Sequence, residues 1–134
     1  MRRRACLIAQ CLAGCLALAS CAADAPDEEA PFEPVYEGIE TQLLDGDLVG
    51  FQVRMSGARD AEDVRHYADC AAAQYALIRG FGYARHLRTT TETRAGVWTG
   101  DAVYTISDER PAGLQVLQAD DVVAGCRAVG IPTV

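Results

Sequence analysis

An Asp-Gly pair between two apolar runs is the feature that most restricts how this chain can fold. Residues 39–44 precede Asp45-Gly46, and the run that follows alternates between apolar and polar side chains. One face of this returning run carries four apolar residues: Val49, Phe51, Val53 and Met55. Because a type I′ turn needs positive φ at both central residues, the pair predicts a β-hairpin with a type I′ turn. The alternation predicts that one face of the second strand is buried.

A helix is predicted from about Ala61 to Arg79. Asp60 is expected to cap its N-terminus, and Gly80 to end it. Six residues share one face at helical spacing: Val64, Tyr67, Ala68, Ala71, Tyr75 and Ile78. This face is expected to pack on a sheet.

Two more strands are predicted at Tyr83–Thr93 and Val97–Ser107, and we interpret Gly100-Asp101 as a β-bulge. The buried face of the later strand is expected to carry Trp98, Ala102, Tyr104 and Ile106. A short strand at Leu114–Leu117 and a short helix, capped by Asp120 or Asp121 and ended by Gly130, complete the pattern. The β-β-α-β-β order predicts an α+β fold, in which an antiparallel β-sheet carries one main helix on one face and a short C-terminal helix.

The N-terminus has the pattern of an export signal. Arg2-Arg3-Arg4 precede roughly 15 mainly apolar residues, too few to span a ~30 Å hydrocarbon core. This arrangement is typical of a secretory signal peptide at residues 1–20. An uncleaved N-terminal anchor is the alternative, which the short run disfavours.

Leu18-Ala19-Ser20-Cys21 resembles the bacterial lipobox. The resemblance implies cleavage before Cys21, lipidation of its thiol and a lipid anchor that holds the domain in the periplasm. A second match ends at Cys15, but cleavage there would leave too short an apolar run. Ala22 follows Cys21, and the absence of Asp at that position favours the outer membrane over the inner one.

The composition after Cys21 changes again at about residue 35. Residues 22–34 hold three prolines and five acids, so residues 21–34 are predicted to form a lipidated, disordered tether. Residues 35–134 are predicted to form the globular domain. Removing residues 1–20 with their three arginines changes the net charge from −7 to −10 (−7 − 3). Such an acidic chain is not expected to bind nucleic acid or anionic headgroups.

The cysteines sort into three groups. Of the six, three lie within residues 1–20 and Cys21 is assigned to lipid, which leaves Cys70 and Cys126. Two thiols in an exported domain predict one disulfide. The alternative is that His66, four positions before Cys70, joins the cysteines in a zinc site or forms a Cys–His nucleophile pair.

The segments Cys70–Gly82 and Gly130–Val134, behind a lipobox, resemble a group of small, uncharacterised alphaproteobacterial lipoproteins. The resemblance covers most of the chain after Cys21. It implies an envelope location and implies no activity.

Other polar residues give weaker indications. Arg79, Arg85, Arg88 and Arg94 form a basic group in an acidic chain and are candidates for contact with an acidic partner or an anionic glycan. His86 is interpreted as a neutral edge histidine. No pair is selected by the spacing of the candidate carboxylates, which are Glu40, Asp45, Asp47 and Asp101.

The sequence therefore favours a non-enzymatic envelope lipoprotein. Its domain is expected to bind an envelope protein or glycan, with no catalytic residue, metal or cofactor. The rival hypothesis is a small periplasmic hydrolase or metal-dependent enzyme that uses His66 and Cys70.

Overall fold

The computed structural model describes residues 30–134, which form seven helices and strands. In chain order they are β1 (Val35–Leu43), β2 (Leu48–Ser56), α1 (Ala61–Ile78), β3 (Tyr83–Arg94), β4 (Val97–Ser107), β5 (Val116–Gln118) and α2 (Ala119–Ala128). The strands form one sheet in the order β1-β2-β4-β3-β5, and every neighbouring pair is antiparallel. The α+β fold with an antiparallel sheet is thus confirmed. The predicted signal peptide, the lipobox with Cys21, and residues 22–29 of the predicted tether lie outside the described residues.

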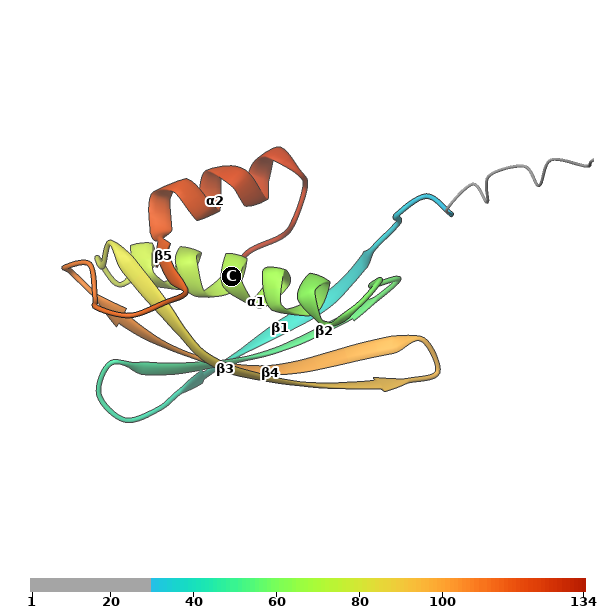
Figure 1. The fold of residues 1–134 in the computed structure, drawn as a ribbon, viewed down its shortest axis with the longest axis horizontal. Coiled ribbons are helices and arrows are strands. Elements are labelled where there is room, and N and C mark those ends of the chain that lie inside the picture. The colour runs from blue at the N-terminus through green and yellow to red at the C-terminus, as the bar shows by residue number, and fades with distance from the viewer. Residues whose placement is uncertain (1–29) are drawn as a thin grey trace, which may run out of the picture. The chain divides into compact units, whose positions relative to one another are not determined.

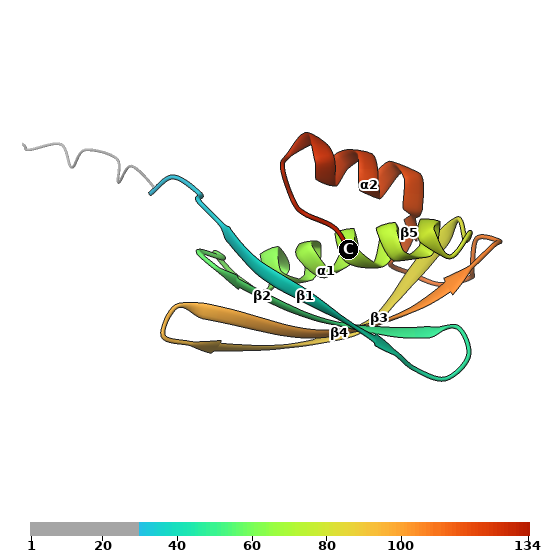
Figure 2. The same cartoon turned by 180° about the vertical axis from the view of Figure 1, so that it is seen from behind.

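Both helices lie on the same side of the sheet, so the elements stack as sheet, α1 and α2 (Figure 1). The view from behind shows the same order (Figure 2). The buried face of the sheet matches the prediction closely. Val49, Phe51, Val53 and Met55 are at most 1% exposed. We call the sheet face toward α1 the inner face and the opposite one the outer face.

Helix α1 is defined at both ends by local hydrogen bonds. The Asp60 side chain accepts from the backbone N–H groups of Glu62 and Asp63, as an N-cap does. At the other end Gly80 has φ +82°, and Phe81 N–H donates to the Ala76 carbonyl. This is a Schellman motif, in which a left-handed glycine allows the last carbonyls to be satisfied. The predicted ends of the helix are confirmed. Ile78, expected on the buried face, is 62% exposed because no described element covers that side of the last turn.

The predicted turn chemistry is wrong at the first hairpin. Gly46 has φ +64°, but Asp45 does not have positive φ, so Asp45-Gly46 is not a type I′ turn. The two adjacent residues with positive φ are instead Ala95 (50°) and Gly96 (77°), which join β3 to β4. The pairing of β3 with β4 extends to Arg94 and Val97, so only two residues are left for the turn. This tight turn needs positive φ at both of them, even though alanine seldom adopts it.

The predicted β-bulge at Gly100-Asp101 is also wrong. The register of β4 is regular there, and the irregularities lie next to Glu37 in β1 and Leu87 in β3. Gly100 has another role, because a Cβ at this position would lie 2.6 Å from Val64 Cγ1. The missing side chain therefore lets α1 approach the sheet.

The C-terminal elements differ from the prediction in their starts. β5 begins at Val116, and α2 begins at Ala119, with Gln118 at the cap position and no side-chain cap bond. Asp120 and Asp121 lie in the first turn of α2 rather than capping it, where the helix dipole favours acids. The Ala119 N–H donates to the Gly82 carbonyl, so tertiary pairing sets where this helix begins.

Candidate functional site

The first candidate site lies between α1 and α2. Cys70 and Cys126 form a disulfide, with their Cα atoms 6.0 Å apart. The residue pair is the one expected from the cysteine count. Cys70 is 0% exposed, because α2 covers that side of α1.

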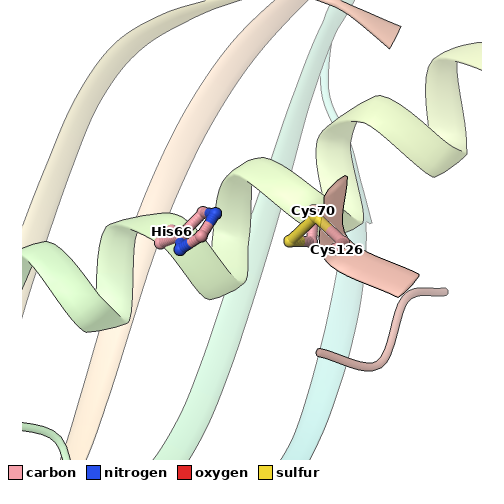
Figure 3. Close-up of side chains that lie close together, drawn as sticks. All are labelled: His66, Cys70 and Cys126. Carbon is pink, nitrogen blue, oxygen red and sulfur yellow. A yellow bond between two sulfur atoms is a disulfide. The ribbon is translucent and has the colours of Figure 1, made fainter. Parts of the chain in front are cut away.

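His66 lies one turn before Cys70 on α1, and its ring is on the side of the disulfide (Figure 3). One ring nitrogen of His66 and the two sulfur atoms all lie within 4.8 Å of one another. His66 is exposed, whereas both cysteines are buried. In the disulfide state no thiolate is available to attack a substrate or to bind a metal.

A buried polar network beside this site was missed by the sequence reasoning. Asp69 is 5% exposed, and its Oδ1 accepts a 2.7 Å hydrogen bond from the Tyr104 hydroxyl of β4. Its Oδ2 accepts a 2.8 Å bond from Arg65, which also pairs with Glu62 on the surface of α1. An aspartate within the alanine-rich stretch of α1 was the only sequence signal, because its partners come from another strand and the preceding turn.

Burial raises the pKa of the Asp69 carboxyl above its ordinary value. The Tyr104 hydroxyl and the Arg65 guanidinium oppose that rise. Burial and the neighbouring Asp69 charge raise the pKa of Tyr104, so this hydroxyl stays protonated and acts as a donor. Tyr104 and Arg65 thus each donate to a different oxygen of Asp69. The bond from Tyr104 joins α1 to β4 within the core.

The four arginines singled out in the sequence do not meet at one point. Arg79 donates to the Tyr75 hydroxyl (2.7 Å), and Arg88 pairs with Asp101 (3.2 Å). Arg85 and Arg94 lie near opposite ends of β3, about 30 Å apart at ~3.3 Å per residue. The described residues thus offer separate cations rather than one anion site.

His86 is half-buried and lies opposite Tyr104, with the ring centroids 5.2 Å apart. Its Nε2 is 2.7 Å from Thr89 Oγ1, and its Nδ1 contacts the Gln115 side chain. These contacts fix the loop before β5 against β3.

The second candidate site is an open depression of about 740 Å³ on the outer face of the sheet. We call this surface the acidic face. Its lining side chains include Glu37, Glu40, Gln52, Arg54, Thr90, Glu92, Thr99 and Asp101. Glu37 pairs with Arg54, and Asp101 pairs with Arg88. Glu40 and Glu92 are exposed, and neither makes an ion pair within residues 30–134. Asp45 and Asp47 lie in the loop between β1 and β2, away from this lining.

These features define a small disulfide-bonded α+β domain in which no element of residues 30–134 covers the outer face of the sheet. Residues 36–130 match the YNQ4 C-terminal domain family, and the chain belongs to that family. A relative from Paracoccus denitrificans, described as an uncharacterised 26.9 kDa protein in the nqo8 5′ region, is 38% identical over 85 residues. This match covers 63% of the chain and 33% of the relative, so the chain spans about a third of that protein. The matches agree with an uncharacterised alphaproteobacterial group.

No solved structure matches the chain. Neither described helix is long and apolar enough to cross a membrane.

Proposed function

We propose that the chain is a lipid-anchored protein of the bacterial envelope whose domain binds a basic segment of another envelope protein and carries out no reaction. The observation that carries the binding proposal is the uncovered acidic face, in which Glu40 and Glu92 remain without ion-pair partners among the described residues.

Two features support the envelope location. The segment Leu18–Cys21 has the residue types of a lipobox. The disulfide between Cys70 and Cys126 fits an oxidising compartment, since such bonds are rare in reducing ones.

The chemistry of the acidic face favours a cationic peptide over a glycan. Its lining contains four acids and one arginine, and two of the acids already have arginine partners. Threonine and glutamine side chains between them can donate and accept hydrogen bonds. No aromatic ring lies in this lining, so the stacking surface that sugars commonly use is absent from it. A basic segment would lie across the strands and pair with Glu40 and Glu92.

The anchor is tested with Cys21→Ala in the full-length chain. The wild-type protein is expected in the membrane fraction with an acylated N-terminal cysteine by mass spectrometry, and the variant in the soluble fraction or unprocessed. Identical fractionation and an unmodified mature N-terminus in both would refute the lipid anchor.

The binding face is tested with Glu40→Gln/Glu92→Gln against a matched control, Asp108→Asn/Glu109→Gln. Both double variants remove two negative charges. The control residues follow Ser107, at the end of β4 away from the part of the strand that lines the acidic face. A synthetic Lys/Gly decapeptide is the probe, titrated at low and physiological salt. We expect the first double to weaken binding by roughly tenfold, about 1.4 kcal/mol, and the control to leave it nearly unchanged. Equal weakening by both doubles, or preferential binding of an envelope glycan by the wild type, would refute the proposal.

A further inference from the structure

We propose that the domain, when its disulfide is reduced, binds one Zn²⁺ ion through His66, Cys70 and Cys126. The disulfide and the metal would then be alternative states of one site on α1 and α2. This inference is independent of the acidic face.

The geometry already brings three suitable ligand atoms together. A His66 ring nitrogen and the Cys70 and Cys126 sulfurs lie within 4.8 Å of one another. Zinc takes sulfur at about 2.3 Å and imidazole nitrogen at about 2.0 Å, so tetrahedral ligands are about 3.5–3.8 Å apart. Rotation of the two cysteine side chains can supply that spacing after the bond is broken, with the Cα atoms 6.0 Å apart.

Contacts other than the disulfide also hold the ligands near one another. His66 and Cys70 are four residues apart on α1, which places both side chains on one side of the helix. Cys126 comes from α2, whose start is held by the Ala119 N–H bond to the Gly82 carbonyl. Figure 3 shows the histidine ring and the two cysteines facing the same space.

The site is open to an ion on one side. Glu62, Asp63 and Asp69 each interact electrostatically with His66, and Arg59 and Arg65 form ion pairs with these acids. The exposed position of His66 gives an ion access from solvent, while the cysteines remain buried. Three protein ligands with water as the fourth is a common zinc arrangement.

The conversion balances with a dithiol reductant as the co-reactant. Its two thiols give two protons and two electrons to the Cys70–Cys126 bond, and the reductant becomes a disulfide. Zn²⁺ then displaces one proton from each cysteine thiol and takes a lone pair from the His66 ring.

The test uses the full chain with Cys6, Cys11, Cys15 and Cys21 replaced by alanine, so that Cys70 and Cys126 are its only cysteines. It is reduced with a phosphine that does not bind zinc strongly. Co²⁺ serves as the spectroscopic probe and Zn²⁺ as its competitor. We expect one ion per chain, thiolate-to-cobalt charge-transfer and tetrahedral d–d bands, and release of two protons. The oxidised chain should show none of these bands.

His66→Ala should weaken zinc binding by at least about tenfold, since even loss of a residue that only supports a ligand costs 10–100-fold. His86→Ala is the matched control, because His86 also interacts with Asp69 but is not one of the three residues whose ligand atoms lie together. Hydrogen exchange of α2 reports folding, and zinc should increase its protection in the reduced wild type. Equal affinities of the two variants, no binding by the reduced chain, or binding without protection of α2 would each overturn the proposal.

Discussion

Replacing Tyr104 by Phe isolates the buried hydrogen bond to Asp69. The ring is retained, so its contacts with Phe51 and His86 are kept and only the hydroxyl is lost. Asp69 is 5% exposed, and water cannot readily replace the missing donor. The carboxylate would keep its bond from Arg65.

The free energy of unfolding is expected to fall by about 2 kcal/mol at neutral pH, because hydrogen bonds to charged groups contribute about 1.5–3 kcal/mol to stability. For a domain of this size, that lowers Tm by roughly 8 °C or more. The sign of the pH dependence follows from the raised pKa of the Asp69 carboxyl. Burial raises the pKa of Asp69 in the fold, so the penalty of its ionisation grows as pH rises through that folded pKa. Removing the Tyr104 hydroxyl raises the pKa further, and the stability loss should therefore shrink toward acid pH, where Asp69 is protonated.

Denaturant unfolding of both proteins from acid to neutral pH measures this difference. Tyr83→Phe is the matched control, because Tyr83 is half-buried and its hydroxyl makes no hydrogen bond within residues 30–134. Asp69→Asn completes a double-mutant cycle with Tyr104→Phe, and a coupling of about 1–2 kcal/mol is expected. A loss below about 0.5 kcal/mol, or one that does not change with pH, would refute the proposed role of the hydroxyl.

Four further substitutions test the packing, the backbone and the disulfide. Gly100→Ala should lower the free energy of unfolding by about 1–3 kcal/mol, because its Cβ would lie 2.6 Å from Val64 Cγ1. Gly125→Ala is the control: its Cβ would have nothing within 4 Å, so it should stabilise α2 by up to about 1 kcal/mol in thermal unfolding. Ala95→Asn should raise Tm slightly, since Asn tolerates the φ of 50° better; a lower Tm would contradict that reading of the turn. Cys126→Ser should cost about 4 kcal/mol for a separation of 56 residues, and hydrogen exchange should show α2 loosening before β2 and β4.

Local patterns in the sequence were sufficient for most of the fold. Period-two alternation identified the buried face of β2, because successive side chains of a strand point to opposite faces. Asp60 and Gly80 marked the ends of α1, since caps depend on a few adjacent residues. The disulfide partners followed from counting cysteines once the first four were assigned elsewhere. The lipid anchor at Cys21 stays a prediction.

Tertiary structure decided everything that depends on distant partners. Asp69 has a buried donor on its Oδ1 only because Tyr104 of β4 reaches it, 35 residues later in the chain. The role of Gly100 depends on how closely α1 approaches the sheet, and the tight turn at Ala95-Gly96 depends on the pairing of β3 with β4. The strand order β1-β2-β4-β3-β5 places Glu40 and Glu92 on one outer face, although they are far apart in sequence. Residue types and short-range periodicity determine which elements form, whereas register and packing between elements determine which side chains meet.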